Sequence, residues 1–238
     1  MRWFDYSIIH FLNQFAQKSW LADKLISGIS SNELTKGAFV AAILWWAWFR
    51  DEKTKTRDRE FVLSGIYTSW VALFVARTLA FFLPFRERPL RNAALQFRIP
   101  LGVNPHELFD WSSFPSDHAV LFFALATCVF FVSRKAGMIA YCHAFFIVCL
   151  PRIYIGIHYP TDVLAGALLG IAVACLFLIN DLRTNVTRFP MLWSERSPAS
   201  FYPFFYLCTF LIGTNFDPVR KVFVGAWHLS RTVLHRSP

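Results

Sequence analysis

The sequence predicts an all-α integral membrane protein, a helical bundle with about six transmembrane helices, because segments that cross lipid must satisfy their own backbone hydrogen bonds. Of the 238 residues, 55% are hydrophobic and only 16% are charged. A soluble domain carries roughly a quarter of its residues as charged side chains. The hydrophobic residues are also gathered into long runs, which short polar connections separate.

Residues 1–36 are predicted to form amphipathic helices or the first membrane helices. Residues 4–17 and 20–29 carry apolar side chains at helical spacing, and Ser19 marks a break between the two stretches. Two helices lying in the membrane interface and one imperfect span both fit this pattern.

Residues 37–180 are predicted to be the membrane core, which also holds every candidate catalytic residue. The apolar run 37–49 is shorter than the roughly 20 residues that a span needs, so we expect this helix to begin nearer residue 30. Residues 61–84 are long enough to cross the bilayer. Three further apolar runs, joined by tight turns, occupy residues 117–133, 137–155 and 162–180.

Residues 181–238 are predicted to form a polar segment followed by a membrane-associated basic tail. Residues 181–200 are polar, a short aromatic run covers 201–213, and residues 219–236 are basic and amphipathic. Because the aromatic run is too short to cross comfortably, we expect it to lie on the surface or to be re-entrant.

Three short polar patches interrupt this apolar chain, each at the edge of a hydrophobic run. They are Arg-Glu-Arg-Pro at 86–89, Pro-Ser-Asp-His at 115–118, and Arg152 with His158 and Asp162. Ionisable groups are costly to hold where lipid meets water, so the three patches indicate a functional site.

The second patch predicts an anion site at the start of a helix. Pro115 suits the first helical position, which would place Ser116, Asp117 and His118 in the first turn. Free N–H groups and the helix dipole favour an anion there. Ordinary capping would explain the serine and the aspartate, but not a histidine that opens an apolar span.

The third patch predicts a second helix start. Pro160 would begin this helix, and the Asp162 carboxylate could accept a hydrogen bond from one ring nitrogen of His158, leaving the other nitrogen free as a nucleophile. Gly156 would let the chain turn back from Arg152. The alternative is a structural His–Asp pair with an arginine that extends to the surface.

The first patch supplies cations. Arg88 has the rigid donor fork that matches phosphate oxygens, and Arg86 and Arg77 are further candidates. The alternative is a basic cluster that contacts lipid headgroups. So many cations with one well-placed carboxylate disfavour a metal ion, so we expect no metal and no cofactor. The combination suits phosphoryl transfer.

These motifs resemble those of the type 2 phosphatidic acid phosphatase superfamily, whose pattern is Lys-x6-Arg-Pro, then Pro-Ser-Gly-His, then Ser-Arg-x5-His-x3-Asp. Three positions depart from it: Phe81 stands where the first lysine is expected, Asp117 replaces glycine, and Pro151 replaces serine. Arg77 lies one helical turn before Phe81 and could replace the lysine. The Pro-Ser-Asp-His variant is similar to bacterial undecaprenyl-diphosphate phosphatases.

The resemblance implies a mechanism. His158, oriented by Asp162, would attack phosphorus, and His118 would protonate the leaving oxygen and then activate water. Paired roles of this kind predict a bell-shaped pH–rate profile. The implied phosphate-binding groups are those of Arg88, Arg152, Ser116, Asp117 and Arg77.

The expected partners are the bilayer and a lipid phosphate or diphosphate, with undecaprenyl diphosphate as the best single candidate. Phosphatidylglycerol phosphate, phosphatidic acid and lipid A phosphates stay open, as do a lipid phosphotransferase, a non-catalytic lipid-phosphate binder and the oligomeric state. Basic residues do not alternate with aromatic ones in a polar region, so the net charge of +9 does not indicate nucleic acid.

The positive-inside rule predicts a multi-pass protein of the inner (plasma) membrane whose site faces the extracytoplasmic side. If the patches share one side, the opposite side holds ten Lys or Arg residues: Arg50, Lys53, Lys55, Arg57, Arg59, Arg134, Lys135, Arg183, Arg188 and Arg196.

Overall fold

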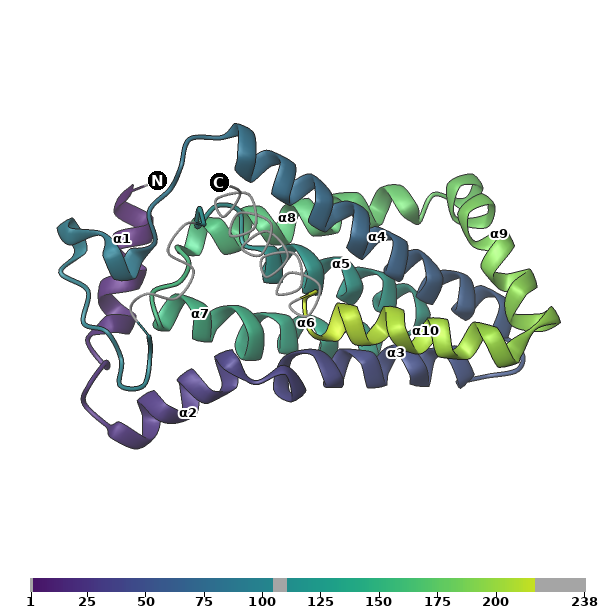
Figure 1. Cartoon of the computed structure of the whole chain (residues 1–238), viewed down its shortest axis with the longest axis horizontal. Coiled ribbons are helices and arrows are strands. Elements are labelled where there is room, and N and C mark those ends of the chain that lie inside the picture. The colour runs from purple at the N-terminus through teal and green to yellow at the C-terminus, as the bar shows by residue number, and fades with distance from the viewer. Residues whose placement is uncertain (1, 105–110, 217–238) are drawn as a thin grey trace, which may run out of the picture.

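The structure is a computed structural model that describes residues 2–104 and 111–216 (Figure 1). Within these residues every regular element is a helix, which confirms the predicted all-α class. The predicted basic tail at 219–236 lies outside the described residues. The α-helices are α1 Arg2–Asn13, α2 Trp20–Ser31, α3 Phe39–Phe49, α4 Lys55–Phe82, α5 Asp117–Val132, α6 Arg134–Cys142, α7 Leu150–Tyr154, α8 Pro160–Phe177, α9 Asn180–Arg196 and α10 Pro198–Gly213.

Four short helical segments complete the described chain. Two are π-helical, η1 Leu34–Ala38 before α3 and η4 His143–Cys149 between α6 and α7. Two are 3₁₀ turns, η2 Pro89–Arg91 and η3 Ala93–Leu95, in the connection between α4 and α5.

Apolar helices of membrane-crossing character form the body of the molecule. Three described helices are long and apolar enough to cross: α4, the continuous stretch Arg134–Tyr154 and α8. Three shorter apolar helices accompany them, Leu34–Phe49, α5 and α10. These six agree with the predicted bundle. The helix that holds the apolar run 37–49 begins at Leu34. This earlier start was expected, because the run alone is too short to cross the bilayer.

Helix α5 occupies the centre of the bundle and packs against α4, α6 and α8. Its apolar residues are buried on nearly every side, and Val120, Leu121, Ala124 and Leu125 are fully enclosed. A helix that is hydrophobic all round is stable only in such a position. The second polar patch therefore lies at the start of the helix that occupies the centre of the bundle.

The two ends of the bundle are closed by different helices. Figure 1 shows α1 crossing one end and α9 crossing the other, while α10 runs alongside α3. Ser19 separates α1 from α2 and caps α2 by accepting a hydrogen bond from the Ala22 N–H, so residues 4–29 form two helices and not one span. Helix α10 buries Phe201 and Phe205 in the main core, which a segment lying only on the surface would not do.

Candidate active site

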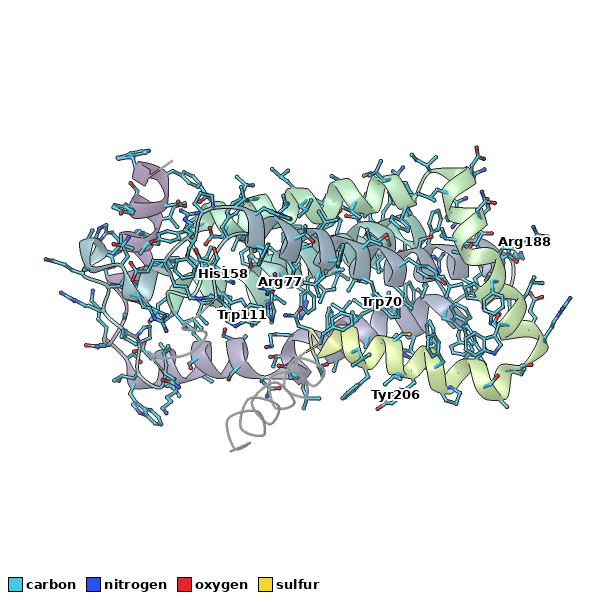
Figure 2. All side chains as sticks on the ribbon, turned by 45° about the horizontal axis from the view of Figure 1, so that its top comes forward. Trp70, Arg77, Trp111, His158, Arg188 and Tyr206 are labelled. Atoms are coloured by element: carbon cyan, nitrogen blue, oxygen red, sulfur yellow. The ribbon has the colours of Figure 1, made fainter. Side chains whose placement is uncertain are left out.

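The three polar patches meet at the end of the bundle where α1 lies. Figure 2 shows His158 and Arg77 in one region, with Trp111 beside them, whereas Arg188 lies at the far end on α9. His158 is in the connection between α7 and α8, and Arg77 is on α4. Arg77 and His158 thus lie in one region although they are 81 positions apart in the sequence (158 − 77).

The third patch is a tight reversal between α7 and α8. The Ile157 N–H donates to the Arg152 carbonyl over 3.0 Å, so the chain folds back on the end of α7. Gly156 takes φ of +76°, a left-handed conformation that glycine adopts without steric cost. The predicted turn at Gly156 is confirmed, and it places both Arg152 and His158 on the buried side.

The first patch docks onto this reversal. The Arg88 side chain is buried, and its Nη1 donates to the Ile157 carbonyl over 2.8 Å. The Leu90 N–H donates to the Gly156 carbonyl over 3.0 Å. The residues on either side of Pro89, Arg88 and Leu90, thus both donate to backbone carbonyls of the reversal. These two contacts hold Arg88 close to His158.

Helix α5 begins two residues later than the sequence suggested, at Asp117 and not at Pro115. Ser116 has an extended backbone and is the N-cap, so Asp117 and His118 are the first helical residues, and Pro115 precedes the cap. The predicted first position for Pro115 is wrong because the chain is still extended at Ser116. The N–H groups of Asp117 and His118 remain in the first turn, where intrahelical acceptors are absent.

Small residues bring the two helix starts together. The Ser116 N–H donates to the Asp162 carbonyl over 3.1 Å, which ties the start of α5 to the first turn of α8. A side chain on Gly166 would collide with the Ser116 carbonyl, and one on Gly170 would collide with the Val120 carbonyl. This spacing of glycines is typical of closely packed membrane helices.

The ring of His158 is held by a backbone carbonyl rather than by Asp162. Its Nδ1 lies 2.8 Å from the Ser113 carbonyl oxygen but 3.8 Å from Asp162 Oδ2. A carbonyl can only accept, so Nδ1 carries the proton and Nε2 keeps its lone pair. The predicted hydrogen bond from His158 to Asp162 is not formed, because Asp162 Oδ2 instead accepts from the Tyr159 N–H over 2.7 Å.

Burial keeps His158 neutral. The residue is 5% exposed, and this desolvation lowers the pKa of His158 to about 4, with the charges of Arg88 and Arg152 acting in the same direction and the Asp162 carboxylate opposing them. A neutral imidazole with a free Nε2 lone pair is the form that can act as a nucleophile.

His118 faces Arg152 across the site. The distance from Arg152 Nη2 to His118 Nε2 is 2.7 Å. The guanidinium is always protonated and can only donate, so the resting His118 accepts at Nε2 and is neutral. Arg152 thus contacts His118, and the charges of Arg88 and Arg152 also act on the ring of His158.

Arg86 belongs to a carboxylate cluster and not to this space. Its guanidinium donates to Asp162, to Thr161 Oγ1 over 2.9 Å, and to Asp5 Oδ2 over 2.6 Å. Asp5 comes from α1 and also accepts from the Thr161 N–H over 2.9 Å. The phosphate-binding role of Arg86 stays a prediction; in this structure its donors are directed at Asp5, Thr161 and Asp162.

Arg77 reaches the site through Asp117. It forms an ion pair with the Asp117 carboxylate, and its guanidinium lies 4.5 Å from the centre of the Trp111 ring. Phe81, which stands in the place of the family lysine, is 84% exposed. The structure thus brings Arg77, and not Phe81, into contact with the start of α5.

Two buried hydroxyl groups border the same site. Among the described residues, Ser113 Oγ and Ser116 Oγ have no hydrogen-bond partner, and both residues are completely buried. A buried hydroxyl without a partner is costly, and an oxyanion between α5 and α8 would supply the missing acceptor.

Sequence reasoning missed three residues of this site: Asp5, Ser113 and Asn215. The amide of Asn215 contacts His118 Nδ1 at 3.2 Å. Asp5 is an acidic residue in an apolar helix, which is a weak signal for a buried partner. The other two carry no sequence signal, since Ser113 acts through its backbone and Asn215 lies 97 residues from its partner.

Comparison with known proteins agrees with this fold and these motifs. The sequence model of the PAP2 superfamily matches residues 82–185, the segment that contains the second and third patches and Arg88. This segment of the chain is therefore similar to the PAP2 superfamily.

Individual relatives are more distant. The chain is 33% identical over 123 residues to the bacitracin transport permease protein BcrC of Bacillus licheniformis, a match that covers 50% of this chain and 55% of that protein. It is 24% identical over 173 residues to the undecaprenyl-diphosphatase BcrC of Bacillus subtilis strain 168, covering 73% and 82%. The chain thus spans about half the length of the first of these relatives.

Among solved structures, the chain is similar to a transmembrane PAP2-type phosphatidylglycerolphosphate phosphatase from Bacillus subtilis. The TM-score is 0.48 at 22% identity, and the match covers 72% of this chain and 81% of that one.

Proposed function

We propose that this membrane protein is a metal-independent phosphatase that hydrolyses a lipid phosphate or diphosphate through a phosphohistidine. The observation that carries the proposal is the pair of histidines beside the joined starts of α5 and α8. His158 is buried near Arg88 and Arg152, and His118 Nε2 lies 2.7 Å from Arg152 Nη2. Phosphoryl transfer needs little more from a protein than a placed nucleophile, a proton donor and cations around the equatorial oxygens.

In the proposed reaction, His158 Nε2 attacks phosphorus and the bond from phosphorus to the leaving oxygen breaks. The Nδ1–H group stays on the Ser113 carbonyl, which carries part of the positive charge that develops on the ring. His118 gives a proton to the leaving oxygen, and then accepts one from the water that attacks the phosphohistidine. Hydrolysis restores His158 and releases phosphate.

The proposed phosphate cradle has cations on one side and helix N–H groups on the other. Arg88 and Arg152 bind the equatorial oxygens, for which Arg152 turns from His118 Nε2 toward the phosphate. The Ser116 hydroxyl and the N–H groups of Asp117 and His118 bind from the start of α5, where the helix dipole also favours negative charge. Arg77 neutralises the Asp117 carboxylate, so that this departure from the family pattern does not repel the substrate.

Asp162 is proposed to act through the first turn of α8. It accepts from the Tyr159 N–H and pairs with Arg86, which fixes the residue next to His158. Its charge, 3.8 Å from His158 Nδ1, also favours the imidazolium-like ring of the phosphohistidine.

The proposed substrate is a long-chain lipid, and undecaprenyl diphosphate, converted to undecaprenyl phosphate, is the first candidate. An apolar groove of about 770 Å³ opens beside Arg86, lined mainly by side chains of α8 and of the connection after α4, including Leu83, Phe114, Leu164 and Leu168. Such a groove suits an isoprenoid or acyl chain. The name of the Bacillus subtilis relative supports the diphosphate. Phosphatidylglycerol phosphate, phosphatidic acid and lipid A phosphates are the competing substrates.

We propose that the site faces the extracytoplasmic side of the inner (plasma) membrane. The charged start of α4 and the basic helix α9 lie at the end of the bundle opposite His158 (Figures 1 and 2). The positive-inside rule assigns the more basic end to the cytoplasm.

A phosphate-release panel tests the proposed function. Purified protein with EDTA present is offered undecaprenyl diphosphate, phosphatidylglycerol phosphate, phosphatidic acid and a lipid A phosphate, and both free phosphate and newly phosphorylated lipid are measured. We expect free phosphate from at least one lipid, and a loss on the order of 10³-fold or more in His158→Ala. The matched control is His10→Ala, which removes an exposed histidine of α1.

Three results would overturn the proposal or part of it. Full activity in His158→Ala would exclude this nucleophile. Phosphorylated lipid in place of free phosphate would make the protein a phosphotransferase. Lipid binding with neither product would make it a non-catalytic binder.

A further inference from the structure

Asn215 contacts His118 from a part of the chain outside the PAP2 match. Its side-chain Nδ2 lies 3.2 Å from His118 Nδ1, and the residue is 2% exposed. The contact spans 97 positions, and the match ends at residue 185. A buried amide in contact with the proposed proton donor can affect the reaction as well as the packing.

The position of Asn215 is set by the core. Residue 215 follows the end of α10 and takes φ of +48°, while its N–H donates to the Ile212 carbonyl over 3.0 Å. The end of α10 lies against η1 because Gly213 and Gly37 let the two backbones touch. Helix α10 is further anchored by the Trp45 Nε1–H, which donates to Thr209 Oγ1 over 3.1 Å. The amide therefore reaches His118 without help from a substrate.

The chemistry of the contact follows from Arg152. Because Arg152 can only donate to His118 Nε2, a neutral ring must carry its proton on Nδ1. An N–H on the ring cannot bond to an amide N–H. A half-turn of the amide, which exchanges its oxygen and nitrogen, places Oδ1 where it accepts from Nδ1–H.

We propose that Asn215 is a positioning residue that accepts a hydrogen bond from His118 Nδ1–H and so directs His118 Nε2 at the leaving oxygen of the substrate. This inference rests on the proposed function, since it gives His118 the role of proton donor. It extends the site to the end of α10.

The same acceptor serves every stage of the proposed reaction. In the resting state, Nδ1–H donates to Asn215 while Nε2 accepts from Arg152. When phosphate draws Arg152 away, Nε2 takes up a proton from the solvent, which it later gives to the leaving oxygen, and Nδ1–H remains on the amide. A fixed partner on one ring nitrogen orients the other, as outer-shell partners do for metal-bound histidines. Within residues 2–104 and 111–216, the charged groups near His118 include Arg152 from α7, Asp117 from its own helix and, through Asp117, Arg77 from α4.

The competing explanation is local. Asparagine is favoured in the left-handed conformation that ends many helices, and that preference alone would account for residue 215. Asn215→Gly separates the two explanations, because glycine keeps the left-handed backbone and removes the amide. Asn215→Asp keeps an oxygen acceptor and adds a negative charge. The matched control is Gln96→Gly, at an exposed left-handed residue with φ of +46°.

The test compares kcat, KM and the pH–rate profile of these variants, with undecaprenyl diphosphate as the probe. We expect Asn215→Gly to lower kcat about 10- to 100-fold, with KM within about twofold, and to move the basic limb of the profile to lower pH. Asn215→Asp should retain more activity and move the basic limb to higher pH, because its charge stabilises the protonated ring. Gln96→Gly should match the wild type. Wild-type kcat and an unmoved basic limb in Asn215→Gly would overturn the inference.

A second measurement separates this inference from the proposed function. Nitrogen-15 NMR of labelled histidine reports which ring nitrogen carries the proton, and His118→Ala identifies the signal. We expect the Nδ1–H form in the wild type and a mixture of forms in Asn215→Gly. If the wild type releases no phosphate, the proposed function fails, and this tautomer change alone still decides whether Asn215 orients His118. An unchanged tautomer in Asn215→Gly refutes the contact.

Discussion

Gly156 offers the sharpest test of how the fold builds the site. Its left-handed backbone reverses the chain between Arg152 and His158, and its carbonyl accepts from the Leu90 N–H, which holds the Arg88 segment in place. One added methyl group, in Gly156→Ala, therefore acts on three proposed site residues at once without touching any of their side chains.

The magnitude has two parts. A left-handed conformation costs an alanine about 1–2 kcal/mol. The new Cβ would also lie 2.7 Å from two ring carbons of Phe97 and 2.9 Å from Leu90 Cβ, closer than carbon atoms pack. Overpacking of this kind costs about 1–3 kcal/mol. The free energy of unfolding should therefore fall by about 2–5 kcal/mol, and displacement of His158 by about 1 Å would lower kcat on the order of 10²-fold.

Thermal unfolding in detergent and phosphate release from the preferred lipid measure the two effects. The matched control is Gly28→Ala in α2, where a Cβ meets nothing within 4 Å, and alanine in a helix should stabilise by about 0.5–1 kcal/mol. If Gly156→Ala has the same Tm and kcat as Gly28→Ala, the reversal does not depend on the left-handed glycine and the reasoning is wrong.

Three further predictions concern charge. Burial lowers the pKa of His158 to about 4, so between ~pH 6.5 and about 4 only the unfolded chain binds the proton. The free energy of unfolding should therefore be greatest above pH ~6.5 and fall by up to about 3 kcal/mol as the pH decreases to about 4. Urea unfolding across this range should show the decrease in the wild type and not in His158→Gln. Asp5→Asn should destabilise the protein by about 1–3 kcal/mol, since Arg86 keeps Asp162 but loses its second carboxylate; a Tm equal to that of the wild type would show that α1 does not need this contact. Arg77→Ala should raise KM about tenfold or more, because it leaves the Asp117 charge beside the phosphate. Adding Asp117→Asn should return KM most of the way to the wild-type value. A double variant whose KM is as high as that of Arg77→Ala would refute the pairing.

Local signals were sufficient for the helices and for the turn. The left-handed Gly156 could be predicted because Arg152 and His158 lie within one short connection, and the glycine is the residue that permits a reversal. The start of α5 was missed by two residues, because proline suits the first helical position and only the extended backbone at Ser116 shows that the helix begins at Asp117.

The partners of the site residues could not be predicted in the same way. Arg86 carries the same charge as Arg88 and sits two positions away, yet the structure directs it to Asp5 and Asp162, while Arg88 reaches the His158 reversal. Which arginine faces a phosphate depends on α1, and the contact between Arg86 and Asp5 spans 81 positions.

The sequence by itself determined that the chain is an all-helical membrane protein with two histidines, an aspartate and several arginines at the edges of its apolar runs. Those facts are local, because hydrophobic runs and motif spacings act over a few turns of helix. Only the tertiary structure decided that Ser113 holds His158, that Asn215 faces His118, and that Arg77 pairs with Asp117. These contacts depend on how closely α5 packs on α8 and α10 packs on η1. The glycines that allow this packing could be recognised only once these segments were seen side by side.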